Sequence, residues 1–236
     1  MAPVRVGYQE WRDLLFMHWP VAVELLRPLV PAHLAIDLYR GEAYVGLIPF
    51  NVLNAGFKWM PEALGLDFLE TNVRTYVKVD GEQPGVYFFS LDAASRLAVI
   101  VASTGLGLPY FYSEMAFERR DNVVEYKVER LNGTRPRLAL RYEIGEPRDA
   151  APDGSLDHFL LERRRLHVER GDSLWIVTVQ HEPYPLRQAR VIEIKDSLIE
   201  AGGLPEPSEL PPLVHFSPGV DVQILAPEIR QAQQPA

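Results

Sequence analysis

Cysteine is absent from this sequence: none of the 236 residues is a cysteine. This excludes disulfides, thiolate metal ligands and a cysteine nucleophile. A chain without cysteine is compatible with a reducing compartment, and we expect a cytoplasmic location. A domain of this length buries enough surface to hold a core without a disulfide or a structural metal.

Long apolar runs and an excess of positive charge are also missing. No apolar run reaches the 18 residues of a membrane-spanning helix, and the first residues lack a signal-peptide core. The net charge is −8, and the cationic cluster Arg163–Arg165 lies between Glu162 and Glu169. Because nucleic-acid binding needs a basic surface, we expect neither nucleic acid nor a membrane as a partner. The composition is compatible with a homo-oligomer.

The familiar catalytic motifs are missing as well. The six histidines form no pair at metal-binding spacing, and no Gly-x-Ser-x-Gly motif occurs. Gly105 and Gly107 follow a predicted helix instead of preceding one, so they cannot form a phosphate-binding loop. We therefore predict no metal and no cofactor.

The chain does contain many short strands separated by turns. No linker divides it, so residues 1–236 are predicted to form one domain, with short helices at 11–19 and 21–29 and a frayed tail at 227–236. About ten strands and few long helices favour a mainly β, β-dominated α+β fold, either a barrel or a sandwich. The predicted strands are 36–39, 42–52, 70–79, 85–91, 112–119, 123–131, 138–144, 165–169, 173–181, 189–194 and 213–224.

The stretch from Phe68 to Met115 organises this pattern. In the strand 70–79 the side chains alternate, which places Glu70 and its even-numbered neighbours on one face. Asp80-Gly81 predicts a turn, and the return strand 85–91 is apolar on both faces, as in a central strand. Residues 93–106 have the length of a helix, with glycines at its end.

This stretch and others resemble the acetoacetate decarboxylase-like superfamily, and most closely its YqjF-like branch, a domain of unknown function. The matching segments are LLFMHWPV (14–21), LRPLVPAHLAID (26–37), ETNVRTYV (70–77), PGVYFFSLDA (84–93), LPYFYSEM (108–115) and HFSPGVDVQI (215–224). They span nearly the whole chain. The resemblance implies a closed antiparallel β-barrel with a central cavity and a few short flanking helices.

The polar face of the strand 70–79 holds the first candidate site. Glu70 and Arg74 are the candidate catalytic residues, and Asn72 and Tyr76 are candidate ligand-binding residues between and beside them. Along the strand, Glu70 and Arg74 lie roughly 13 Å apart. An arginine binds a carboxylate through paired hydrogen bonds, and a buried glutamate can act as a general base. The resemblance supports this interpretation, because acetoacetate decarboxylases have an active-site glutamate in the matching strand. The alternative is a solvated face with an ordinary ion pair.

The turn Gly107–Phe111 departs from the family pattern. Acetoacetate decarboxylases have Gly-x-Pro-Lys-Lys here, and the first lysine forms the Schiff base, but this chain has Tyr110 and Phe111. The family's catalytic arginine also has no counterpart near Ala102. Lys78 shares the Glu70 face, but it is more simply explained as a solvated lysine. The fold is therefore expected without the Schiff-base chemistry.

Two further residues have competing interpretations. Tyr110 is a candidate ligand-binding hydroxyl, or a ring that only packs in the core. Asp92 is a candidate ligand-binding carboxylate, or the cap of the helix that follows it.

Three functions remain open from the sequence. The first is a barrel that binds a small molecule, such as an organic or oxo acid held by Arg74. The second is a lysine-independent lyase, hydratase or isomerase that uses Glu70 and Arg74. The third is a non-catalytic structural or interaction domain whose interior is filled by side chains.

Overall fold

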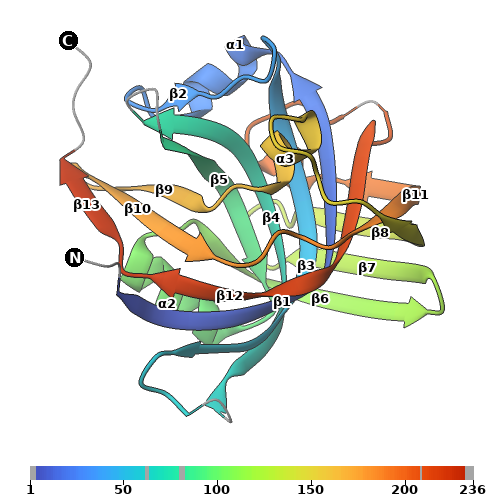
Figure 1. The fold of residues 1–236 in the computed structure, drawn as a ribbon, viewed down its shortest axis with the longest axis horizontal. Coiled ribbons are helices and arrows are strands. Elements are labelled where there is room, and N and C mark those ends of the chain that lie inside the picture. Colours follow the sequence, from blue (N-terminus) through green and yellow to red (C-terminus); the bar gives the residue numbers. More distant parts are fainter. Residues whose placement is uncertain (1–3, 62–63, 80–82, 208, 232–236) are drawn as a thin grey trace.

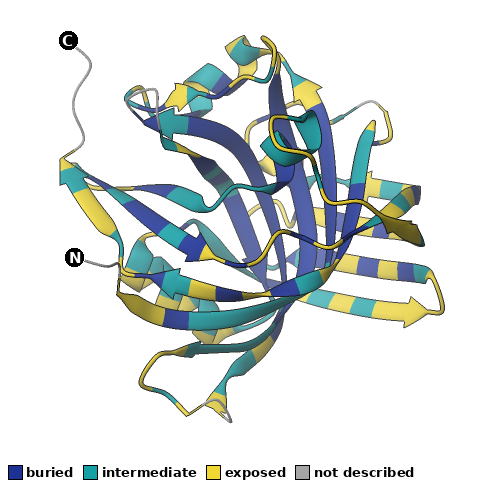
Figure 2. Cartoon of the chain, viewed as in Figure 1, coloured by how far each residue is buried: buried dark blue, intermediate teal, exposed yellow. Residues whose placement is uncertain are grey.

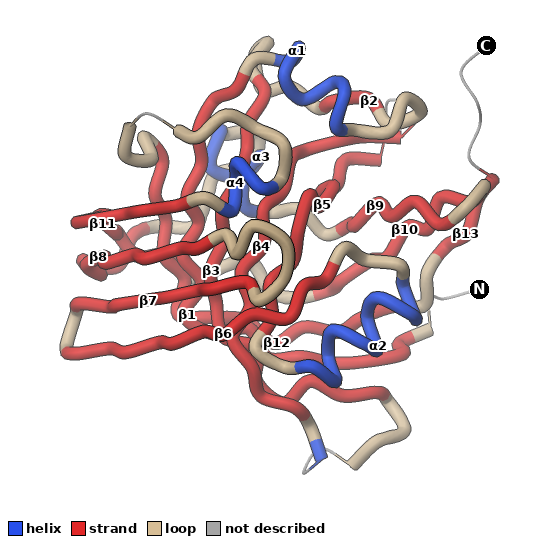
Figure 3. The backbone as a smooth tube through the Cα atoms, turned by 180° about the vertical axis from the view of Figure 1, so that it is seen from behind, coloured by secondary structure: helices blue, strands red, loops and turns tan. Residues whose placement is uncertain are grey.

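The computed structural model describes residues 4–61, 64–79, 83–207 and 209–231, and strands dominate it (Figures 1 and 3). The strands are β1 Arg5–Val21, β2 Ala35–Ile36, β3 Ala43–Phe57, β4 Leu66–Val79, β5 Gln83–Ala93, β6 Tyr110–Arg120, β7 Val123–Arg130, β8 Arg137–Arg148, β9 Arg165–Arg170, β10 Ser173–Gln180, β11 Leu186–Asp196, β12 Leu213–Leu225 and β13 Glu228–Gln231. The helices are α1 Val23–Leu26, the 3-10 helix η1 Arg27–Leu29, α2 Arg96–Leu106, α3 Leu156–Leu161 and α4 Leu198–Ala201. None of the helices described is long and apolar enough to cross a membrane.

The strand pairings form a ring. Hydrogen-bonded neighbours follow the order β5, β6, β7, β8, β11, β12, β1, β3, β4, and β4 pairs with β5 again. A smaller ring uses β12, β1, β3, β4 and β5 and is completed by β9 and β10. The mainly β fold is confirmed. The expected all-antiparallel pairing is wrong at one strand, because β5 pairs in parallel with both β6 and β9.

The two rings enclose two hydrophobic cores. We call them the α3-side core, which includes Phe16, Phe88 and Leu160, and the β7-side core, which includes Met17 and Tyr126. The strands β1, β3 and β4 belong to both rings, so both of their faces are covered. Figure 2 shows β3 and β4 buried over most of their length, and β1 is buried from Leu14 to Trp19.

The first strand corrects the predicted helix at 11–19. Residues 5–21 form β1, which sends Leu14 and Phe16 into the α3-side core and Leu15 and Met17 into the β7-side core. A continuous apolar run fits a helix and a doubly covered strand equally well by periodicity, and here the two cores decide for the strand. The second predicted helix, 21–29, is confirmed as α1 followed by η1.

The central stretch follows the prediction with smaller changes. The strands 70–79 and 85–91 are the larger parts of β4 and β5, and the predicted turn at Asp80-Gly81 lies outside the described residues. The helix begins at Arg96, and Ser95 caps it by accepting a hydrogen bond from the backbone N–H of Ala98. The predicted cap at Asp92 is therefore wrong, because Asp92 still belongs to β5. The predicted frayed tail is wrong at 228–231, which form β13 against β10.

Candidate functional site

The polar face of β4 lies inside the protein. Glu70, Asn72, Arg74 and Tyr76 are all buried, and Tyr76 belongs to the α3-side core. The solvated interpretation of this face is therefore excluded. Both faces of β4 are covered, and the charged residues alternate into the core beside α3.

Glu70 forms one end of this polar row. The Tyr110 hydroxyl donates a hydrogen bond of 2.7 Å to Glu70 Oε2, so Tyr110 does more than pack its ring. Burial raises the pKa of Glu70 to about 7, against the opposing effect of the Tyr110 hydrogen bond. Burial and the nearby carboxyl also raise the pKa of Tyr110 well above its usual range. At neutral pH the pair holds a carboxyl that can give or take a proton beside a phenol that stays protonated.

Asp92 belongs to a different cluster. It pairs in register with Thr71, whereas Ala93 pairs with Glu70, so Asp92 lies on the opposite face of the sheet. Its carboxylate accepts two hydrogen bonds from Arg130, at 2.8 and 2.7 Å, and one from Ser113 at 2.7 Å. This ion pair is buried, with the side chains of Arg130 and Asp92 6% and 0% exposed. The structure thus separates Asp92 from the other five predicted residues.

The two residues at the family's lysine positions divide between these clusters. Tyr110 pairs in register with Leu91 and reaches Glu70, whereas Phe111 pairs with Asp92. The guanidinium carbon of Arg130 lies 3.9 Å from the centre of the Phe111 ring, which is a close cation–π contact. Neither side chain can form an imine. Tyr110 instead contacts Glu70, and Phe111 instead contacts Arg130.

Arg74 lies between Asn72 and Tyr76 in this row, and its charge has no anionic partner among the described residues. It is 9% exposed, and no carboxylate oxygen among the described residues lies within 4 Å of it. Its one protein hydrogen bond runs from Nη2 to the carbonyl oxygen of Leu160, at 3.2 Å, and Nε has no partner. The rings of Phe16 and Tyr76 lie 5.8 Å from the guanidinium. Buried charges are normally paired, so Arg74 is the anomaly of this core.

Tyr76 connects Arg74 to a histidine that sequence analysis did not select. The Tyr76 hydroxyl donates to the Leu160 carbonyl at 2.8 Å and contacts His18 Nε2 at 2.7 Å. Since the phenol has a single hydrogen, His18 Nε2 is the donor in that contact. Burial and the neighbouring Arg74 hold the pKa of His18 well below its usual value. His18 is thus a neutral ring, and its Nδ1 is an unpartnered acceptor.

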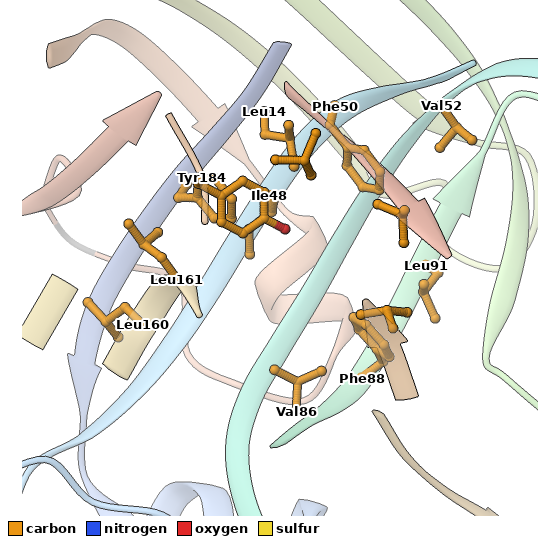
Figure 4. Close-up of a cluster of buried hydrophobic side chains, with 14 of the residues drawn as sticks. Leu14, Ile48, Phe50, Val52, Val86, Phe88, Leu91, Leu160, Leu161 and Tyr184 are labelled. Carbon is orange, nitrogen blue, oxygen red and sulfur yellow. The ribbon is translucent and has the colours of Figure 1, made fainter. Parts of the chain in front are cut away.

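The short helix α3 closes this core. Figure 4 shows Leu160 and Leu161 gathered with Leu14, Ile48 and Tyr184. A second buried arginine fixes the end of the helix, because Arg163 Nε donates a hydrogen bond of 2.6 Å to the Phe159 carbonyl oxygen and Nη1 forms an ion pair of 2.8 Å with Asp37. No local pattern predicts that the Leu160 carbonyl faces Arg74 and Tyr76, since these contacts join residues more than 80 positions apart.

The described residues offer neither a metal site nor a substitute lysine in this row. No group of three or more histidine, aspartate or glutamate side chains in the described ranges could hold a metal ion. Lys78, the one lysine that shares the β4 face, lies 3.4 Å from Asp37 in a partly exposed ion pair. Lys78 therefore has a carboxylate partner and is partly exposed.

Solved structures share this arrangement of strands. The enduracididine biosynthesis enzyme MppR complexed with pyruvate superposes with a TM-score of 0.66 at 13% identity, covering 99% of this chain and 92% of that one. An acetoacetate decarboxylase gives a TM-score of 0.66 at 15% identity, covering 99% and 93%. Identities this low show the fold alone, and that fold is acetoacetate decarboxylase-like.

Sequence similarity assigns the chain to a family, which is narrower than the fold. The model of the family DUF2071, described as an uncharacterized conserved protein, matches residues 8–221. The uncharacterized protein YqjF of Bacillus subtilis (strain 168) is 39% identical over 216 residues, which are 91% of this chain and 88% of that protein. The chain belongs to the DUF2071 family.

Proposed function

We propose that this protein binds a small organic acid, with the ligand carboxylate held by Arg74 in the α3-side core. The observation that carries the proposal is the buried guanidinium without an anionic partner. A buried cation of this kind costs several kcal/mol in the ligand-free protein. A bound carboxylate would remove that cost and would form the paired hydrogen bonds that a guanidinium favours.

The surroundings of Arg74 favour an anion over a cation. A second guanidinium, Arg163, lies 5.3 Å from the ring of Tyr76, on which Arg74 also lies, and its own charge is already paired with Asp37. Asn72 Oδ1, on the same strand face, has no hydrogen-bond partner, so it can accept a hydrogen bond from a hydroxyl group of the ligand. MppR, which shares the fold, was solved with pyruvate, and a 2-oxo acid is the first ligand class to test.

Thermal unfolding in the presence of a panel of small acids tests the proposal. Acetate, lactate, pyruvate and longer oxo acids would be compared on the wild-type chain, the Arg74→Met variant and the surface control Arg190→Met. A ligand at about 100 times its Kd stabilises by roughly 2.7 kcal/mol, a shift of about 5–10 °C for this size. The shift is expected in the wild type and the control and is lost in Arg74→Met. A panel without any shift overturns the proposal.

A second candidate function follows from Glu70. A carboxyl whose pKa lies near 7, hydrogen-bonded to Tyr110, suits a proton transfer on an oxo acid held by Arg74. The reaction would be a lysine-independent lyase, hydratase or isomerase step. Any turnover found should fall by about 10²–10⁴-fold in Glu70→Gln, while binding of the acid persists. Borohydride trapping of an oxo acid on a lysine would instead reinstate the Schiff-base mechanism.

A further inference from the structure

A pocket of about 390 Å³ lies where one edge of β5 is interrupted. That strand pairs with β4 on one edge, while on the other edge Val86 pairs with β9 and Leu91 pairs with β6. Residues 87–90 have no strand partner on this second edge among the described pairings. The walls of the pocket come from β5, β9, the segment before β6, η1 and the end of α4. The pocket thus joins elements that are distant in the sequence.

The aromatic side chains that β5 presents to this pocket point away from Arg74. Phe88 pairs directly with Arg74 and belongs to the α3-side core, so its neighbours Tyr87 and Phe89 point to the other face of the sheet. The centroids of these two rings lie 5.8 Å apart. They pack against a third, smaller apolar cluster, which consists of Val30, Leu34, Val77, Val79, Leu174 and Ile176. The pocket therefore has aromatic surface on the face of β5 opposite to the proposed acid site.

The strand β9 supplies the polar groups of the pocket. Because Val168 belongs to the α3-side core, its neighbours His167 and Glu169 point to the opposite face, where both line the pocket. The His167 ring lies against Gly85, where a Cβ atom would come within 2.5 Å of the imidazole, so the glycine makes room for the ring. None of the described residues from Glu70 to Tyr76 lines the pocket, which is therefore distinct from the Arg74 site.

His167 is the unsatisfied group of this pocket. It is 1% exposed, and neither ring nitrogen has a hydrogen-bond partner among the described residues. Burial, followed by the effects of Arg165, Arg230 and His33, lowers the pKa of His167 to about 4. At neutral pH one ring nitrogen is therefore a donor and the other an acceptor. Buried polar groups are normally hydrogen-bonded, so a ligand that carries both a donor and an acceptor suits this ring.

The charges around the pocket favour an uncharged ligand. Among the described residues that line it, Glu169 is the one charged side chain, and its ionic neighbour is His33, at 3.6 Å. The Glu169 carboxylate opposes an anionic ligand. Arg165 and Arg230 do not line the pocket, but they lie close enough to lower the pKa of His167, so they oppose a cationic ligand.

We propose that this pocket is a second small-molecule site, which binds an uncharged aromatic amide. The ring of the ligand lies against Tyr87 and Phe89, and the N–H and carbonyl groups of the amide meet His167 and Glu169. Pockets of this size with an apolar, aromatic lining and a few polar groups are typical of small-ligand sites. The site is independent of the proposed function, because no residue of the Arg74 row lines it.

Three probes of similar shape test the charge that the pocket accepts: benzamide, which is uncharged, benzylamine, which is a cation, and benzoate, which is an anion. Each is titrated onto the full chain in ligand-observed NMR, and the two charged probes are also added as competitors of bound benzamide. Benzamide should bind in this pocket at least tenfold more tightly than either charged probe. Glu169→Gln should reduce the preference for benzamide over benzoate.

Variants of His167 test the polar contact. His167→Phe keeps a ring and removes both nitrogens, so it should weaken benzamide binding by about three- to tenfold. His167→Gln keeps a donor and an acceptor and should retain most of the affinity. The surface control Arg190→Met should bind benzamide as the wild type does. Circular dichroism melts confirm that each variant is folded before it is titrated.

Competition with pyruvate distinguishes the two sites. Saturating pyruvate should leave the affinity for benzamide unchanged, and displacement of benzamide by pyruvate would overturn the second site. The absence of benzamide binding, or equal competition by a charged probe, would overturn it as well. Unchanged benzamide binding in His167→Phe would overturn the assignment of His167. A failure of the acid panel at Arg74 alters none of these results, so the two proposals fail separately.

Discussion

Two buried arginines stand in opposite situations on the two faces of the central sheet. Arg130, in the β7-side core, meets Asp92 through two hydrogen bonds, and Ser113 supports the same carboxylate. Arg74, in the α3-side core, has no carboxylate partner among the described residues and donates a hydrogen bond to the Leu160 carbonyl. Both arginines are buried, so they differ in whether an anion is paired with them.

The comparison separates a structural ion pair from a candidate binding group. A buried pair that is complete has nothing left to offer a ligand, and removing one partner exposes the full cost of the other charge. A buried cation that is incomplete weakens the free protein and gains by binding an anion. The predicted site residue Asp92 belongs to the first class, while Arg74 belongs to the second.

The largest expected effect comes from breaking the complete pair. Arg130→Met leaves Asp92 buried without a counter-charge, and the free energy of unfolding should fall by about 3–5 kcal/mol. Urea denaturation measures it. The matched control is Arg190→Met, which breaks the exposed pair with Glu143 and should cost less than about 1 kcal/mol. Equal effects of the two variants would show that the buried pair has no special role.

The next effect is the pH dependence contributed by Glu70. Because its pKa is raised from 4.5 to about 7 in the fold, the folded state holds the proton more tightly than the unfolded chain does. Its contribution to stability is complete below pH 4.5 and is lost as the pH rises to about 7, by about 3 kcal/mol. Glu70→Gln should lack this decline. Urea unfolding of both chains between pH 4.5 and 8 gives the difference, and parallel pH profiles would contradict it.

The incomplete arginine should behave in the opposite way to Arg130. Without ligand, Arg74→Met removes an unpaired buried charge and sacrifices one long hydrogen bond, so the free energy of unfolding should rise by about 1–2 kcal/mol. Denaturant titration of the ligand-free protein measures this. A loss of stability as large as that of Arg130→Met would mean that Arg74 already has its partner.

The smallest effect concerns Tyr110. Tyr110→Phe keeps the ring and removes the hydrogen bond to Glu70, which should cost about 0.5–1.5 kcal/mol. Since that hydrogen bond lowers the pKa of Glu70, its loss should also move the decline of stability to higher pH. An unchanged midpoint in the pH profile would show that the hydroxyl does not act on the carboxyl.

The shared face of Glu70 and Arg74 could be predicted from the sequence, whereas its inward direction and its partners could not. Alternation placed Glu70 and Arg74 on one face, and the resemblance to a known fold left the inward and the solvated interpretations both open. The partner of Asp92 is 38 residues away, and the carbonyl that meets Arg74 is 86 residues away. Such contacts depend on how the ring closes, which no local pattern contains. For the same reason residues 11–19 of β1 were predicted as a helix, since only the two cores on the faces of this strand distinguish it from a helix.

The most direct test of this account measures thermal unfolding of the wild type and Arg74→Met, with and without the best small acid of the panel. The two proteins are expected to exchange their order of thermal stability when the acid is added. Without acid the variant unfolds at the higher temperature, by about 2–4 °C per kcal/mol, and with saturating acid the wild type does, because only the wild type gains from the ligand. If the acid raises the unfolding temperatures of both proteins equally, Arg74 is not the anion site.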